Sequence, residues 1–248
     1  MHPQLDRSRL VFHPLAERVN RVSIERDHVA PETPARAADG AAAALLDDTA
    51  ARIRAAVEAE RPVVAAFGAH TIKNGLGPVL IALMEHGYLS HLATNGAGII
   101  HDWEFSYLGA TSEHVRANVA DGTFGNWEET GRFINLALAV GAAEGRGYGE
   151  SIGALIEQDG LTLPPVDRLA ARIRAAATDD PDAAGSSADL LSVVRGRGLP
   201  AGRLEVAHRW KRFSVQAAAF RLGIAFKGPP MIGHDLIYNH PCTHAGAV

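Results

Sequence analysis

Residues 61–104 read RPVVAAFGAHTIKNGLGPVLIALMEHGYLSHLATNGAGIIHDWE, and this stretch decides the fold class. The apolar run Pro62–Phe67 predicts a strand, which Gly68 ends. The apolar residues that follow have the spacing of a helix lying on a sheet: Leu76, Val79, Leu80, Leu83 and Met84. Gly87 ends that helix, and Tyr88–Thr94 predicts a second strand. The stretch therefore predicts a strand–helix–strand unit with parallel strands and a right-handed crossover.

Polar residues and glycines gather in the two loops that follow the predicted strands. The first loop contributes Gly68, His70, Lys73, Asn74 and Gly75. The second contributes Asn95, Gly96, Gly98, His101, Asp102 and Glu104. Ligands of open α/β sheets bind at the carboxyl ends of the strands. Both loops are therefore expected to line one crevice.

The composition is typical of a globular protein. The chain has 248 residues, 47% of them hydrophobic and 21% charged, which is enough for one large or two small domains. Its net charge of −4 argues against a surface for nucleic acid. No apolar run is long enough to span a membrane, and the first residues lack a signal-peptide core. The single cysteine, Cys242, excludes an internal disulfide, so a cytoplasmic protein is expected.

The first 38 residues differ in pattern from the rest. They are rich in Pro, Arg and His, which predicts an N-terminal arm, residues 1–38, with one short strand near Val19–Ile24 and no core of its own. Such an arm is either disordered or packed on a neighbouring subunit. Residues 39–248 are predicted to form a single domain that opens with a helix over 40–59.

Beyond the central unit the pattern is mostly helical, with only four or five weak strands in all. A short helix is predicted to open at Thr111–Glu113, and a longer one to cover about 126–143. Residues 178–188, TDDPDAAGSSA, are typical of an exposed linker. A further helix is predicted over Glu205–Leu222, and Met231–Tyr238 predicts the end of a strand.

Three polar residues after the second glycine turn are candidates for catalysis. His101 can act as a general acid or base, and Asp102 or Glu104 can hold a substrate ammonium. The alternative is a helix start, where acidic residues interact favourably with the helix dipole.

Gly96, Gly98 and Lys73 each have more than one interpretation. The glycines allow the backbone to approach a pyrophosphate at a helix N-terminus, or simply allow a tight turn between strand and helix. Lys73 either binds a phosphate or carboxylate, forms an imine with a substrate, or is a solvated loop lysine.

The chain has twelve histidines, which raises the question of a metal. His240 and His244 have a spacing found in zinc sites, and His234 lies nearby. Pro241 lies between the pair, so they do not share a helix face, and no second pair has metal-ligand spacing. A metal site is not expected.

The motifs GAHTIKNGLGPVLIALMEHG, HLATNGAGIIHDWE and GATSEHV together resemble the deoxyhypusine synthase-like superfamily, and its bacterial branch in particular. In the synthases a Ser-Asn-containing loop precedes a helix, and a Thr-Ala-Gly-Gly turn is followed by acidic residues. Here Gly68–Gly75 stands in the first place and Asn95–Gly98 in the second. The resemblance covers roughly residues 60–248 and is strongest over 64–115. The archaeal-type, NAD-dependent ornithine cyclodeaminases are similar in the second region.

The resemblance implies a Rossmann-like three-layer α/β fold with a mostly parallel sheet, formed by residues 39–248, and an NAD cofactor. The implied cofactor contacts are Gly68, His70, Asn74, Asn95, Gly96, Gly98 and Asp235. In such enzymes NAD takes a hydride from the carbon that bears an amine, an amine captures the resulting imine, and the hydride is returned. The implied substrate is a small amine or amino acid. Family members are oligomers, so a homodimer or homotetramer is expected.

Two departures from the family pattern change these expectations. His101 partly replaces the acidic pair that holds a polyamine in the synthases, so a polyamine substrate is not expected. In the segment HPCTHAGAV, His244 and Ala245 stand where the synthases have Asp-Gly. The synthases continue past that loop to their imine-forming lysine, with which Lys73 does not align. A C-terminally truncated family member is therefore expected.

Two other functions stay open. The chain is either an enzyme of this kind or an inactive or truncated relative that serves in binding or assembly. The third possibility is a metal-assisted hydrolase built on the histidine-rich loops.

Overall fold

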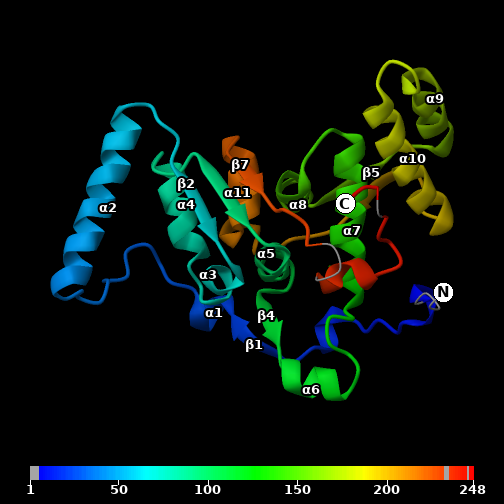
Figure 1. Ribbon diagram of the computed structural model, residues 1–248. Coiled ribbons are helices and arrows are strands. Elements are labelled where there is room, and N and C mark those ends of the chain that lie inside the picture. Colours follow the sequence, from blue (N-terminus) through cyan, green and yellow to red (C-terminus); the bar gives the residue numbers. More distant parts are fainter. Residues whose placement is uncertain (1–5, 232–234, 245) are drawn as a thin grey trace, which may run out of the picture.

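The computed structural model describes residues 6–231, 235–244 and 246–248 (Figure 1). The protein is an α/β structure with 54% helix and a small parallel sheet, a layout compatible with a Rossmann-like arrangement. Within the described residues, the strands form one three-stranded sheet and two separate pairs. The α/β class is therefore confirmed, although the parallel sheet is smaller than a mostly parallel architecture predicts.

The strands of the central unit pair as predicted. β2 (Val64–Phe67) and β3 (His91–Thr94) are parallel along their whole length. β7 (Ala225–Lys227) lies on the other side of β3 and is also parallel to it. The order β2-β3-β7 leaves β2 and β7 at the two edges. The strand–helix–strand prediction for residues 61–104 is confirmed.

The helices of this unit differ in one respect from the prediction. The region after β2 is not a simple loop, because α3 (Ala69–Lys73) forms there before α4 (Gly77–Glu85). After β3, the side chain of Asn95 caps α5 (Gly96–Leu108) by accepting from the Gly98 amide at 3.0 Å. α5 then runs through the core, so the residues expected in a loop after β3 are helical.

Two antiparallel pairs flank the sheet. β1 (Asn20–Ser23) pairs with β4 (Ala110–Glu113), and β5 (Gly160–Leu163) pairs with β6 (Gly202–Glu205). The predicted helix start at Thr111–Glu113 is wrong, because β1 from the N-terminal segment supplies a partner strand for these residues. Local sequence does not reveal such a partner, since 86 or more residues separate the two strands.

The rest of the core is helical (Figure 1). α7 (Glu128–Ala143) is buried along most of its length and packs against α8 (Tyr148–Glu157). α8 in turn packs against α11 (Val215–Leu222), and α9 (Val166–Ala176) packs against α10 (Pro181–Gly196). The helix predicted over about 126–143 is confirmed, with its start at Glu128.

Small residues allow these helices to approach one another closely. A Cβ on Gly153 of α8 would lie 2.6 Å from the Gln216 carbonyl oxygen of α11. A Cβ on Gly141 of α7 would overlap the side chain of Ser151. Glycine is therefore required at both helix contacts.

The N-terminal segment packs on its own chain. It contains η1 (Arg7–Arg9), η2 (Leu15–Glu17), β1 and α1 (Ile24–Asp27). Leu15 is fully buried and Ile24 almost so, and both belong to the main hydrophobic core. The prediction of an arm without contacts to its own core is therefore wrong for this part of residues 1–38. Its strand near Val19–Ile24 is confirmed as β1.

The remaining elements are α2 (Gly40–Glu58), α6 (Val115–Ala120), η3 (Lys211–Phe213) and η4 (Leu236–Asn239). α2 confirms the helix predicted over 40–59, and in Figure 1 it stands apart from the body of the molecule. None of the helices in the described ranges combines the length and the apolarity that a membrane crossing needs.

Three predictions for the second half of the chain are wrong. Most of the linker predicted at 178–188 is the first half of α10, which begins because Asp180 caps the Ala183 amide and Pro181 takes the first turn. The helix predicted over Glu205–Leu222 begins only at Val215, after Ser214 caps it. The strand end predicted at Met231–Tyr238 includes η4 instead, and residues 232–234 lie outside the described ranges.

Candidate functional site

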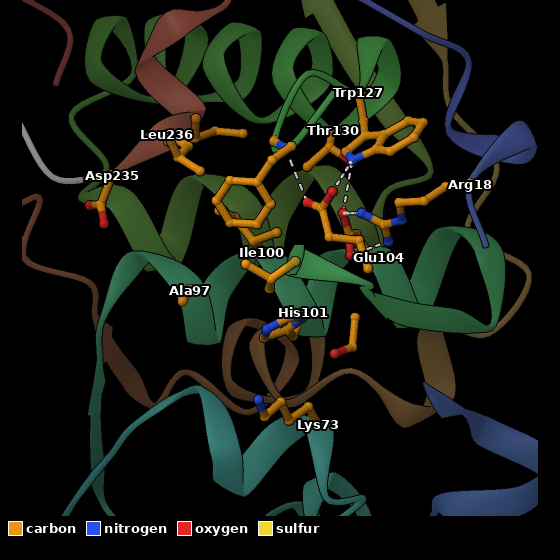
Figure 2. Close-up of a pocket in the computed structure, with 16 residues that line it drawn as sticks. Arg18, Lys73, Ala97, Ile100, His101, Glu104, Trp127, Thr130, Asp235 and Leu236 are labelled. Atoms are coloured by element: carbon orange, nitrogen blue, oxygen red, sulfur yellow. Dashed lines mark hydrogen bonds and ion pairs between the residues drawn. The ribbon is translucent and has the colours of Figure 1, made fainter. Parts of the chain in front are cut away.

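A cavity of about 510 Å³ lies beside α5, among segments that are far apart in the sequence (Figure 2). Its volume is in the range of small-molecule sites. The walls come from the N-terminal segment, α3, α5, β4, α7 and η4. The residues predicted from the sequence that line it are Lys73, His101, Glu104 and Asp235.

Hydrogen bonds fix the ring of His101. Its Nδ1 lies 2.8 Å from Oγ1 of Thr111, and that hydroxyl donates to Oε2 of Glu104. A threonine hydroxyl has one proton, so it accepts from His101 and Nδ1 carries the ring proton. Nε2 of the neutral ring then keeps its lone pair. The arrangement therefore selects the tautomer in which Nε2 can accept a proton.

The environment also keeps His101 neutral. Burial lowers the pKa of His101, Glu104 opposes that shift, and the nearby cations Lys73 and Arg18 lower the pKa further. The net pKa lies below the ordinary value of 6.5. His101 therefore has the protonation state of a general base at neutral pH.

Glu104 is the charged end of this chain of hydrogen bonds. Arg18 donates to both of its carboxylate oxygens, at 2.8 and 2.6 Å, and Thr130 donates to Oε1 at 3.0 Å. Burial raises the pKa of Glu104, but Arg18 outweighs that effect and the net pKa is lowered. Since Arg18, Thr111 and Thr130 occupy the carboxylate, the prediction that Glu104 anchors a substrate ammonium is not supported by its geometry.

Lys73 and Asp235 bring opposite charges to the cavity. Among the residues that the structure describes, none forms a hydrogen bond or ion pair with the Lys73 ammonium. Asp235 accepts from the Met231 amide at 3.0 Å through Oδ2. Figure 2 shows Asp235 beyond Ala97, near the start of α5. The cavity thus offers an ammonium and a carboxylate on different walls.

Glu113 is a third carboxylate at the cavity, after Glu104 and Asp235. Its Oε2 accepts from Asn118 Nδ2 at 2.6 Å and from Trp127 Nε1 at 3.1 Å, and its Oε1 accepts from the Gly125 amide at 3.1 Å. Because Oε1 receives one hydrogen bond, it has capacity for a further donor. The neighbouring Ser112 has φ of 70°, a conformation that is unfavourable for serine. Such strain is often found at functional sites.

Asp102 does not line the cavity. Its buried carboxylate accepts from Ser214 Oγ and from the amides of Val215 and Gln216, at 2.7 to 3.1 Å, and from Gln216 Nε2 at 3.0 Å. Burial raises the pKa of Asp102, and these hydrogen bonds oppose the shift. This geometry does not support the predicted catalytic role, because the Asp102 carboxylate caps α11 from the side of α5.

The glycines of the second loop are required by packing within the chain. A Cβ on Gly98 would overlap Oγ1 of Thr94, and a Cβ on Gly96 would lie 2.6 Å from Oδ2 of Asp235. The space beside each glycine is therefore filled by a side chain. It is not open to a pyrophosphate. Gly96 and Gly98 were predicted to let the backbone approach a pyrophosphate, whereas the structure requires glycine there for packing against Asp235 and Thr94.

The other predicted cofactor residues lie at the carboxyl edge of the sheet. A Cβ on Gly68 would be 3.8 Å from Nδ2 of Asn95, so the two strand-end regions are neighbours as predicted. Gly68, Asn95, His70 and Asn74 are exposed and do not line the cavity. The cavity lies along α5 from Ala97 in the first turn to Glu104.

The histidines of the last segment face different partners. His240 Nε2 lies 3.1 Å from Glu128, and His244 Nδ1 lies 3.1 Å from Asp189. His234 lies outside the described residues. In the described part of the chain, no three His, Cys, Asp or Glu side chains form a group that could hold a metal ion.

Sequence reasoning missed much of the site. Arg18, Thr130 and Trp127 were not predicted as site residues, and Thr111 and Glu113 were predicted only to open a helix. A buried arginine needs a buried carboxylate, but the sequence shows neither that Arg18 is buried nor which carboxylate lies beside it.

Comparison of the chain with family models, with curated proteins and with solved structures found no match.

Proposed function

We propose that the cavity beside α5 is the active site of an enzyme that acts on a small amine or amino acid with NAD as its redox cofactor. The observation that carries this proposal is the set of hydrogen bonds that orients His101 through Thr111 and Glu104. A neutral histidine in a defined tautomer at the wall of a 510 Å³ cavity is a general base held ready for a substrate proton.

The other charged residues have complementary roles. Oε1 of Glu113 accepts a hydrogen bond from the substrate ammonium. Nε2 of His101 takes a proton from that ammonium, and the neutral amine nitrogen can then donate electrons. The apolar side chains of Ile100 and Leu236 on the wall limit the access of water to an imine. Glu104 and Arg18 stay bound to each other and hold the base in place.

NAD fits these residues at its ribose and at a phosphate rather than along the glycine turn. Asp235 offers a carboxylate, the group that binds ribose hydroxyls in dinucleotide sites. Lys73 offers an ammonium for a phosphate. NAD, when bound, would supply a hydride acceptor for the substrate carbon that bears the amine.

The fold and the motifs support the same proposal. The parallel strands β2, β3 and β7, with site residues following the first two, are compatible with a Rossmann-like domain. The loops after β2 and β3 carry the resemblance to the deoxyhypusine synthase-like superfamily. We therefore assign the chain to a Rossmann-like fold of that type as part of the proposal.

The first experiment measures the cofactor in the purified full chain. After denaturation, NAD is sought in the supernatant by mass spectrometry and absorbance, and zinc in the protein by elemental analysis. NAD titration follows, with Lys73→Met and Asp235→Asn expected to weaken binding and the exposed Arg172→Met as the matched charge control. Failure of the native chain to bind NAD at millimolar concentration, or stoichiometric zinc, contradicts the proposal.

The second experiment tests the base. Amines and amino acids are added to the NAD-loaded chain, and transient formation of reduced nicotinamide is followed by absorbance. His101→Asn should slow this step by roughly 10²-fold or more while NAD affinity stays unchanged. A His101→Asn chain that reacts as fast as the native one would remove His101 from the mechanism.

A further inference from the structure

Helix α2 does not pack on the hydrophobic core of the described structure. None of its 19 residues is buried, and within the described ranges no residue of α2 belongs to the core or packs against it. Leu45 and Leu46 are 66% and 61% exposed. In Figure 1 the helix stands at one side of the molecule, away from the other helices.

Such a helix needs a partner. Most of the stability of helices in proteins comes from packing of an apolar face, because propensity alone leaves a short helix marginal in water. α2 is rich in alanine. Its Leu45 and Leu46 are exposed in the single chain, and Ile53 and Val57 are only half-buried. An apolar face that the core does not cover marks an interaction surface.

The apolar residues of α2 form a narrow seam. Their spacing alternates between three and four residues: Ala43, Leu46, Ala50, Ile53 and Val57. This is the spacing of the two core positions of a coiled coil rather than the wide stripe of a helix that lies on a globular core. The seam therefore fits a second helix.

The charges beside the seam fit a second copy of α2 in the opposite direction. Asp47 directly follows the core residue Leu46, and Arg54 directly follows the core residue Ile53, one heptad later. Asp47 and Arg54 therefore lie on the same side of the seam. In an antiparallel pair, these equivalent positions face each other, so Asp47 of each copy meets Arg54 of the other. In a parallel pair they would instead face Ala42 and Thr49, which carry no charge.

The other side of the seam suits the same arrangement. The positions that precede the core residues there are small: Ala42, Thr49 and Ala56. In an antiparallel pair these positions face one another, which lets the two helices approach closely on that side. Neither side of the seam opposes like charges.

We propose that α2 binds α2 of a second copy of this chain as an antiparallel pair and so forms a two-fold symmetric dimer. The surface continues beyond the helix. β2, which follows α2 in the chain, is an edge strand of the sheet, and its Val64 is 59% exposed. Exposed edges of this kind are usually covered. This inference is independent of the cavity beside α5 and of its proposed function.

The mass of the full chain in solution tests the dimer. Light scattering coupled to gel filtration at tens of micromolar should give twice the mass of the chain. Ile53→Asp places a charge in the seam of both copies and should weaken the dimer by about a hundredfold or more. Ala55→Asp adds the same charge on the opposite face of α2 and should leave the dimer unchanged. A monomeric native chain, or a dimer that survives Ile53→Asp, would overturn the proposal.

Exchange of the charges tests the direction of the pair. Asp47→Arg alone, or Arg54→Asp alone, places like charges opposite each other and should weaken the dimer by about fivefold, whereas the double variant should restore it. Mixed single-cysteine variants Leu46→Cys and Ile53→Cys should cross-link with each other more than with themselves. The buried Cys242 is present in all variants, and the native chain controls for it. Preferred cross-linking of each variant with itself would show a parallel pair and overturn the arrangement.

Discussion

Arg18 and Glu104 form a two-point ion pair in the interior, although 86 positions separate them in the sequence. The side chains are only 3% and 1% exposed. The pair fastens the N-terminal segment to α5 at the wall of the cavity. The same carboxylate accepts from Thr111, which orients His101, so this contact links the stability of the fold to the geometry of the site.

Removal of Arg18 should destabilise the protein strongly. Arg18→Met leaves Glu104 buried without its cation, and an uncompensated buried charge of this kind costs about 3–5 kcal/mol. The free energy of unfolding is measured by urea denaturation at neutral pH. Arg26→Met is the matched control, because Arg26 forms an ion pair on the surface with Asp27 and its side chain is 62% exposed. That variant should change stability by about 1 kcal/mol or less. Equal effects of the two variants would contradict the structure.

Gly98 should prove to be a packing residue. Gly98→Ala places a Cβ against Oγ1 of Thr94 and should cost about 1–3 kcal/mol of stability, as overpacking does. Adding Thr94→Ala removes Oγ1 and Cγ2 of residue 94 and should recover part of that loss in stability. The recovery is partial because the hydrogen bond from the Thr94 hydroxyl to the Phe67 carbonyl is lost as well. Thermal and urea denaturation of the single and double variants give the coupling between the two positions. Strictly additive effects would argue against this contact.

The sequence predicted the elements whose signals are local. The central unit was predictable because strand, helix and glycine turn follow one another within residues 61–104, and the strands pair with each other. α2 and α7 were predictable from their periodicity. His101 and Lys73 were predictable as site residues because they follow strands at the edge where ligands of α/β sheets bind.

The sequence did not predict what depends on distant partners. β4 was taken for a helix start because its partner strand β1 lies near the N-terminus. Asp102 was taken for a substrate anchor because nothing local shows that the start of α11 lies against it. The Arg18–Glu104 pair and the wall formed by Glu113 arise from the same kind of long-range contact. Each of these features is fixed by tertiary packing, which overrides the local pattern.

Asp102 should affect stability rather than ligand binding. Asp102→Ala leaves the buried amides of Val215 and Gln216 without an acceptor, so a loss of about 3 kcal/mol or more is expected. The loss should be accompanied by early fraying of α11, which hydrogen exchange at these amides can detect. If Asp102→Ala instead kept native stability and lost only affinity for amines, Asp102 would belong to the binding site after all.

His208 should make the stability depend on pH. It is buried edge-on against the rings of Trp103 and Tyr107, which stack on each other, and burial lowers the pKa of His208 to about 4 from 6.5. The unfolded chain therefore binds a proton that the folded chain does not between these two values. The stabilising contribution of the neutral ring is complete above pH 6.5 and is lost as the pH falls toward 4, by about 3 kcal/mol in all.

The variant His208→Phe tests this dependence. It keeps an aromatic ring of similar size and removes the titrating group, and neither ring nitrogen of His208 has a hydrogen-bond partner within the described structure. The slope of unfolding free energy against pH between 6.5 and 4 should therefore become shallower. An unchanged slope would assign the acid sensitivity to other groups.

Thr111 should control the tautomer of His101. In the native chain the Thr111 hydroxyl accepts from Nδ1 and donates to Glu104, so the Nδ1–H tautomer should dominate and the pKa of His101 should lie below 6.5. Nitrogen-15 NMR of labelled histidine reports both properties without any substrate.

Thr111→Val keeps the shape of the side chain but removes the hydroxyl, so the two tautomers should mix while the fold is retained. It also removes one hydrogen bond from Glu104, which Arg18 and Thr130 continue to hold. Ser112→Ala, one residue further along β4, is the control and should leave the spectrum of His101 unchanged. A native His101 protonated on Nε2, or a tautomer that ignores Thr111→Val, would show that these hydrogen bonds do not orient the base.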